Sequence, residues 1–109
     1  MAKKPDFLPG TLDMLILKTL SLRSRHGYGI AQHIRQTSDS ALNVEEGSLY
    51  PALQRLLVQG FVKAEWRQSE TNRRARYYSL TPSGRKQCGI AVSQFEQLVA
   101  AIGRVLRTA

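Results

Sequence analysis

The sequence predicts a mainly α-helical fold with one small β-hairpin, an α+β class, in a single small domain of 109 residues. Three observations support this prediction. Apolar residues recur with a helical period in the first 60 residues and again after residue 81. Between residues 62 and 80 the period changes to two, which is typical of strands. Clusters of Gly, Pro, Ser and Asn separate these stretches and indicate turns.

The first two helices are expected within the first 40 residues. Helically spaced apolar residues predict a helix over residues 11–22, with Thr11 as a possible cap after a Pro-Gly pair. The glycines of "RSRHGYGI" interrupt the pattern, which resumes at Tyr28 and continues to about Thr37. We expect His26 to cap or pack this second helix rather than bind a metal, since no set of nearby ligands accompanies it.

The third helix is expected in "EEGSLYPALQRLLVQG", and its two faces differ in chemistry. Proline is tolerated only near a helix start, so Pro51 places that start near Gly47 or Ser48, while Gly60 ends the helix. One face is apolar, with leucines at helical spacing. The other face carries a hydroxyl, a phenol, an amide and a guanidinium, on Ser48, Tyr50, Gln54 and Arg55.

A hairpin is expected after the third helix. In "FVKAEWR" every second residue is apolar, and this places Trp66 on the strand face that should join the core. "QSETNRR" is a polar turn, and "ARYYSL" has the aromatic, β-prone composition of a second strand. Basic residues cluster at the tip and along the strands, where Glu70 is the only acid of the loop: Arg67, Arg73, Arg74 and Arg76.

A long last helix is expected to begin in "TPSG", with Thr81 as its cap and Pro82 at its first position, and to continue to Leu106. Its apolar positions alternate in steps of three and four, which is a heptad seam. The seam consists of Cys88, Ala91, Phe95, Leu98, Ile102 and Val105. It would pack either on its own domain or on a second copy, and a length of nearly 40 Å favours the second copy.

Three helices followed by a hairpin form the winged helix-turn-helix arrangement, here expected over residues 1–81, with residues 82–109 as a C-terminal dimerisation helix. In such a domain the third helix enters the major groove of DNA. Ser48 and Tyr50 would donate hydrogen bonds to phosphates, Gln54 would pair with adenine, and Arg55 with guanine or phosphate. The alternative is an ordinary exposed helix face, and the two glutamates just before this helix favour it mildly because they would repel phosphate.

The net charge of +8 indicates a polyanionic partner such as nucleic acid. Arg73, Arg74 and Arg76 on the hairpin, the wing of this fold, are expected to reach the DNA backbone or a neighbouring minor groove, where arginine is favoured. A merely solvated charged turn is the alternative. An acidic membrane surface would also suit the charge. Separately, no apolar run is long enough to span a membrane.

The segments "LPGTLDMLILKTL", "HGYGIAQHI", "EEGSLYPALQRLLVQGFVKAEW" and "NRRARYYSLTPSGRK" resemble, in order and spacing, the PadR family of transcriptional regulators. The resemblance covers residues 8–86 and corresponds to the family's short branch, with one C-terminal helix. It implies a winged-helix repressor that is dimeric through this helix and binds an inverted repeat in a promoter. It also implies that Ser48, Tyr50 and Arg76 contact DNA. Some members of the family bind aromatic or drug-like effectors near the dimer interface, but nothing in this sequence identifies such a pocket.

Other classes of protein are disfavoured. No nucleophile with a base, paired carboxylates or glycine-rich phosphate loop is present, so we expect neither an enzyme nor a bound cofactor. The lone Cys88 cannot form an internal disulfide, which suits the cytoplasm, and binding to DNA would place the protein at the nucleoid. Cys88 is expected to be a small buried hydrophobe, with oxidative sensing as the alternative. The start of the chain lacks the long apolar region of a signal peptide. A winged-helix protein or RNA adaptor and a nonspecific chromosome coat remain open as alternative functions.

Overall fold

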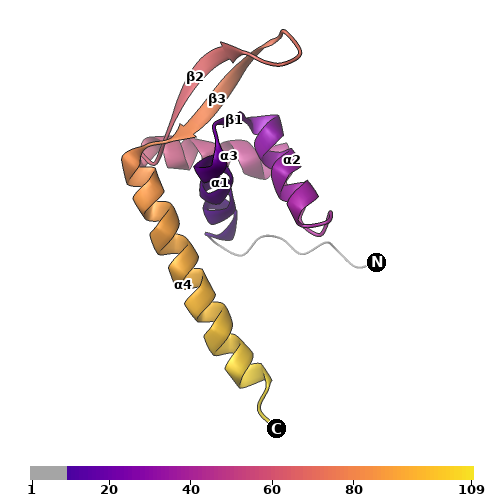
Figure 1. The fold of residues 1–109 in the computed structure, drawn as a ribbon, viewed down its shortest axis with the longest axis vertical. Helices are drawn as coiled ribbons and strands as arrows, with labels where there is room; N and C mark the ends of the chain where they lie inside the picture. Colours follow the sequence, from indigo (N-terminus) through magenta and orange to yellow (C-terminus); the bar gives the residue numbers. More distant parts are fainter. Residues whose placement is uncertain (1–9) are drawn as a thin grey trace.

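The structure is a computed structural model that describes residues 10–109. The expected absence of a signal peptide concerns residues 1–9 and lies outside this range. Four helices and three strands follow one another along the chain (Figure 1). They are α1 (Thr11–Leu22), β1 (Arg25–His26), α2 (Gly27–Thr37), α3 (Glu46–Val58), β2 (Val62–Gln68), β3 (Arg74–Leu80) and α4 (Pro82–Leu106). The expected class, mainly helical with a small amount of β structure, is confirmed.

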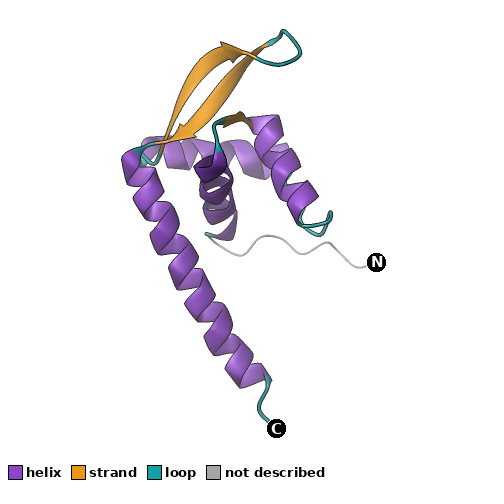
Figure 2. Ribbon diagram, viewed as in Figure 1, coloured by secondary structure: helices purple, strands orange, loops and turns teal. Residues whose placement is uncertain are grey.

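The core lies where α1, α2 and α3 meet the base of the sheet. Helix α1 is central, because it contacts α2, α3, α4 and β3. The largest fully buried side chains come from the apolar faces that the helical period predicts: Ile16, Ile30, Leu49, Leu53 and Leu56. The β2–β3 hairpin and α4 both extend from this core, in different directions (Figure 2). The core thus holds two projecting elements in fixed positions.

The sheet has three strands rather than two, in the order β1-β3-β2, and all pairs are antiparallel. The sequence prediction missed β1, in which Arg25 pairs with Tyr78 and His26 with Tyr77. Two polar residues have no measurable period, so only the long-range pairing with β3 defines this strand. The strand ends at α2, where the His26 Nδ1 accepts a hydrogen bond of 3.0 Å from the Gly29 N–H. This confirms His26 as the cap of α2.

The helix starts correct two expectations. The cap of α1 is Gly10, in a left-handed conformation with φ of 83°, and Thr11 is the first helical residue instead of the cap. Helix α3 begins at Glu46, earlier than Gly47, so Pro51 lies in its second turn. Pro51 cannot donate to the Gly47 carbonyl, but both residues are exposed. Water can therefore satisfy that carbonyl, and the proline is tolerated one turn further in than expected.

The expectation that Trp66 joins the core is wrong, because the side chain is 59% exposed. The strand period is correct, since Val62 and Tyr78, on the same face of the hairpin, are buried. The hairpin, however, extends beyond the helices that cover its base (Figure 1). Trp66 is part of this extension, where the apolar face has no core to pack against.

The start of α4 is fixed against the turn between α3 and β2. The Thr81 N–H donates to the Phe61 carbonyl at 3.1 Å, and the Thr81 hydroxyl donates to the Gly60 carbonyl at 2.7 Å. The same hydroxyl accepts from the Gly84 N–H at 3.0 Å, which confirms Thr81 as the helix cap. Gly84 is buried so closely that a Cβ there would lie 1.8 Å from the Phe61 carbonyl oxygen. Only glycine allows this approach, which sets the direction of α4.

Candidate nucleic-acid interface

Tyr50 lies at the junction of α3, the start of α2 and the sheet. It is 47% exposed. Its ring rests against Gly27, where a Cβ would lie 2.9 Å from the phenol oxygen. Partial burial raises the pKa of the Tyr50 phenol, and Glu46 and Tyr78 raise it further. Tyr50 therefore remains a neutral hydroxyl, able to donate a hydrogen bond on the side of α3 that faces the sheet.

Arg55 lies on the opposite flank of α3 and is already paired. Its Nη2 is 2.8 Å from Asp13 Oδ1, and its Nε is 3.4 Å from Asp13 Oδ2. The hydrogen bond and charge of Asp13 raise the pKa of Arg55. Asp13 is in the first turn of α1, so this pair fixes the C-terminal half of α3 to α1. A base contact by Arg55 would require loss or sharing of this pair, so the placement favours a positioning role over base reading.

Gln54 and Ser48 are exposed on α3. Within residues 10–109, neither side chain makes a hydrogen bond, so both are free to meet a partner. At 3.6 residues per turn Gln54 lies close to the Tyr50 side of the helix, and Ser48 lies close to the Arg55 side. The four residues predicted on this helix therefore divide into two pairs on two flanks. Tyr50 and Gln54 form the pair nearer to the wing.

The wing carries Arg74 and Arg76 on one face, the face to which Trp66 also belongs. Trp66 is directly opposite Arg76 in the register. The Arg74 guanidinium is 5.5 Å from the centre of the Trp66 ring, and that of Arg76 is 5.7 Å from the centre of the Tyr78 ring. Arg73 is exposed in the turn just before β3. These three predicted arginines lie together at the outer part of the wing.

Arg67 differs from the other wing arginines because it is on the opposite face and is fully engaged. It pairs with Glu65 at 2.9 Å, donates to the Ser24 hydroxyl at 2.8 Å, and lies 4.5 Å from the centre of the Tyr77 ring. Within the described chain, the ion pairs are this one and that of Arg55. The outer wing arginines therefore keep their full charge for a partner.

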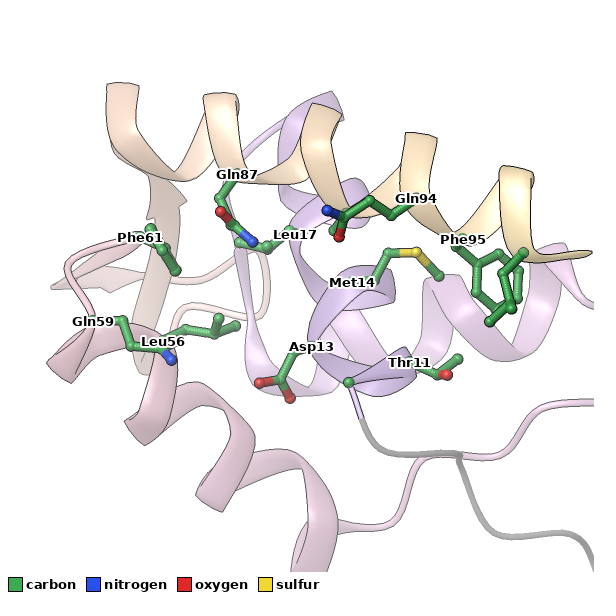
Figure 3. A pocket seen from close by; sticks show the side chains of 13 residues that line it. Thr11, Asp13, Met14, Leu17, Leu56, Gln59, Phe61, Gln87, Gln94 and Phe95 are labelled. Carbon is green, nitrogen blue, oxygen red and sulfur yellow. The ribbon is translucent and has the colours of Figure 1, made fainter.

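The predicted seam of α4 is covered at its start and bare at its end. Cys88 is buried on α1, and Ala91 and Phe95 are partly covered. Phe95 and Met14 line a hollow of about 360 Å³ between α4 and α1 (Figure 3). The last three seam residues are 56%, 48% and 70% exposed: Leu98, Ile102 and Val105. Within the described residues, its own domain therefore covers only the first turns of the seam.

Metal-ligating side chains do not cluster in the described part of the chain. Between residues 10 and 109, no three His, Cys, Asp or Glu side chains gather closely enough to hold a metal ion. Burial raises the pKa of the Cys88 thiol, and this makes it a poor nucleophile or sensor. Among the helices of this part of the chain, none has the length and apolar character needed to cross a membrane.

Comparison with known proteins agrees with this architecture. The family model described as "Transcriptional regulator PadR-like family" matches residues 16–89. A transcriptional regulator from Clostridium thermocellum is 32% identical, with a TM-score of 0.79 over 87% of this chain and 92% of that chain. A PadR family regulator from Eggerthella lenta is 29% identical, with a TM-score of 0.76 over 92% of this chain and 85% of that chain. A PadR family regulator from Clostridium difficile is 27% identical, with a TM-score of 0.77 over 89% of this chain and 99% of that chain.

Proposed function

Because the chain belongs to the PadR-like family of transcriptional regulators, we propose that it binds a specific DNA operator as a homodimer and represses transcription from the cytoplasm, at the nucleoid. One observation carries this proposal. The exposed polar side chains of α3 and the unpaired arginines of the wing are on adjacent elements of a chain with a net charge of +8. Such a basic, two-part surface matches the groove and the backbone of duplex DNA.

In this proposal α3 lies in the major groove. Gln54 is the base-reading candidate, because it is exposed and unpaired and its amide can bond adenine in two places. Tyr50 and Ser48 are candidates for phosphate contacts, which fix the register without reading sequence. Arg55 holds α3 on α1 through Asp13, so its proposed role is to position the helix in the groove. Glu45 and Glu46 are exposed at the start of α3, where they would repel phosphates, so the DNA backbone would have to lie to one side of them.

The wing supplies the second contact. Arg73, Arg74 and Arg76 are exposed, and each guanidinium can bond a phosphate or enter a narrow minor groove. An adaptor that binds protein would have no need for an arginine cluster beside an exposed polar helix. DNA is therefore the partner that uses both halves of the surface.

The bare end of α4 supports a dimer. Exposed large apolar residues at helical spacing are costly in water and are typical of an interface. A second copy would cover Leu98, Ile102 and Val105 by pairing its own α4 with this one. Two copies related by a two-fold axis would present two α3 helices to one face of the duplex. Half-sites about one helical turn apart, roughly 34 Å, would then form an inverted repeat.

Selection from a random DNA pool tests this proposal. Repeated rounds of binding at near-physiological salt should enrich an inverted repeat with half-sites one turn apart. Enrichment of a single half-site would contradict the dimer and leave sequence-specific binding intact. A pool that binds without any enriched motif would indicate a nonspecific coat, and a pool that does not bind would favour a protein or RNA adaptor.

A further inference from the structure

The exposed tryptophan of the wing lies outside the hydrophobic core. Trp66 is 59% exposed, and it is the only tryptophan of the chain. Surface tryptophans of this exposure are uncommon outside binding sites, because burying the indole contributes so much to stability. The last four residues of β2, from Glu65 to Gln68, are all exposed, so packing within this chain does not explain the tryptophan.

The strand face around Trp66 has a distinct chemistry. Beyond the buried base of the hairpin, this face consists of Trp66, Gln68, Arg74 and Arg76. It therefore carries two positive charges and no acid, since Glu65 is on the opposite face and Glu70 is in the turn. The Arg74 guanidinium lies over the indole, at 5.5 Å from the ring centre. The indole ring of Trp66 thus lies between the Arg74 and Arg76 guanidiniums, which have no ion pair within residues 10–109.

This face also continues toward α3. Tyr78 is on the same face, nearer to the core, and Arg76 lies over its ring at 5.7 Å. At its base this face packs on α3, because Val62 and Tyr78 join the core that the leucines of α3 also form. Tyr78 also helps to raise the pKa of the Tyr50 phenol on α3. The tryptophan and the polar flank of α3 therefore belong to one side of the molecule. A duplex that meets α3 on that flank would also meet the Trp66 face of the wing.

We propose that Trp66 contacts the minor groove of the DNA, with its indole packed on the deoxyribose wall and Arg74 held over the ring for entry into the groove. The proposal rests on the function proposed above. The walls of a minor groove are apolar sugars and its edges are phosphates, which match an indole between two guanidiniums. The indole also keeps the guanidinium of Arg74 in one place, so less side-chain freedom is lost on binding.

Quenching of tryptophan fluorescence tests this contact directly, because all tryptophan emission of the chain comes from Trp66. Acrylamide should quench the free protein strongly. Saturation with the selected duplex should lower the quenching constant several-fold, while a scrambled duplex at the same concentration should leave it near the free value. A quenching constant that is already low in the free protein would overturn the proposal, because Trp66 would then be covered without DNA.

Anisotropy of a labelled duplex, measured on the same samples, separates the two proposals. If no duplex binds, the DNA-binding function fails and the Trp66 contact fails with it. If the duplex binds and the quenching constant stays unchanged, the Trp66 contact alone is refuted. A large change in the circular dichroism of the bases, together with a strong loss of tryptophan emission on DNA binding without acrylamide, would indicate insertion between base pairs. That result would overturn packing on the sugars.

Substitution provides an independent test. Trp66→Ala should weaken operator binding roughly five- to tenfold, and Trp66→Phe should restore part of the loss. Lys63→Ala, on the opposite face of the same strand, is the matched control and should stay within about twofold, because screening limits the reach of a distant surface charge. Thermal melts should show that both alanine variants fold like the wild type.

A double substitution tests the pairing with Arg74. On an Arg74→Ala background, Trp66→Ala should cost less than it does alone, because part of its effect acts through the guanidinium. Equal costs on both backgrounds would refute the positioning role. Operator affinity of Trp66→Ala equal to that of the wild type would refute the contact as a whole.

Discussion

Gly84→Ala tests how the long helix is joined to the DNA-binding body. The added Cβ would lie 1.8 Å from the Phe61 carbonyl oxygen, whereas an ordinary contact begins at 3.4 Å. The helix and the carbonyl must therefore separate by about 1.6 Å. A shift of that size breaks the hydrogen bonds from Thr81 to the Gly60 and Phe61 carbonyls, which are 2.7 and 3.1 Å long.

The expected destabilisation is about 2–4 kcal/mol. Two hydrogen bonds contribute about 1 kcal/mol each, and the forced displacement costs about 1–3 kcal/mol. Alanine regains at most about 1 kcal/mol of helix propensity over glycine. For a domain of this size each kcal/mol lowers the melting temperature by about 4–8 °C.

Gly89→Ala is the matched control in the same helix. A Cβ at Gly89 meets no atom within 4 Å, and the position is outside the apolar seam. The control should leave stability unchanged or raise it by up to about 1 kcal/mol. Urea unfolding of both variants at one protein concentration measures the difference, since dimer stability depends on concentration. If Gly84→Ala is as stable as Gly89→Ala, the account of how α4 is fixed is refuted.

Three further predictions concern the α4 seam, the polar face of α3 and the buried cysteine. Leu98→Asp should yield a monomer, measured by light scattering, and should bind the operator weakly, because it places a charge in the exposed part of the seam. A dimer of unchanged mass would contradict the α4 interface. Gln54→Ala should cost about 1–3 kcal/mol and relax discrimination at one base pair, measured on a panel of single-substituted duplexes, whereas a uniform loss would indicate a phosphate contact. Cys88 should react with iodoacetamide far more slowly in the folded than in the unfolded protein, since burial raises the pKa of its thiol and keeps it protonated; equal rates would place it outside the core. The free energy of unfolding should fall as the pH rises past the ordinary thiol pKa, because the Cys88 thiol ionises at lower pH in the unfolded protein than in the folded one.

Much of the fold could be predicted because local patterns define its helices and its hairpin. The apolar periods and the cap at Thr81 located α1, α2 and α4 closely. The second strand of the hairpin was equally clear from its alternation. The strand β1 could not be predicted, because two residues have no period and their pairing partner is about 50 residues away in the chain.

The candidate site was predicted in composition but not in arrangement. The sequence identified the polar face of α3. It did not show that Arg55 on this face pairs with Asp13, which is 42 residues away in the chain, whereas Gln54 makes no such pair. It placed Trp66 on the correct strand face but in the core, since a period of two does not tell where the covering helices end. The need for glycine at position 84 was also hidden, because it depends on the close approach of the Phe61 carbonyl, which a local pattern does not show.

The central claim is that this surface recognises DNA by sequence. An anisotropy titration at near-physiological salt tests it most directly, with a labelled duplex from the gene's own upstream region and a scrambled duplex of equal length. We expect tight binding to the native duplex, with a preference of about a thousandfold or more over the scrambled one. Equal, weak binding to both duplexes would contradict sequence-specific regulation if a duplex selected from a random pool also binds no more tightly.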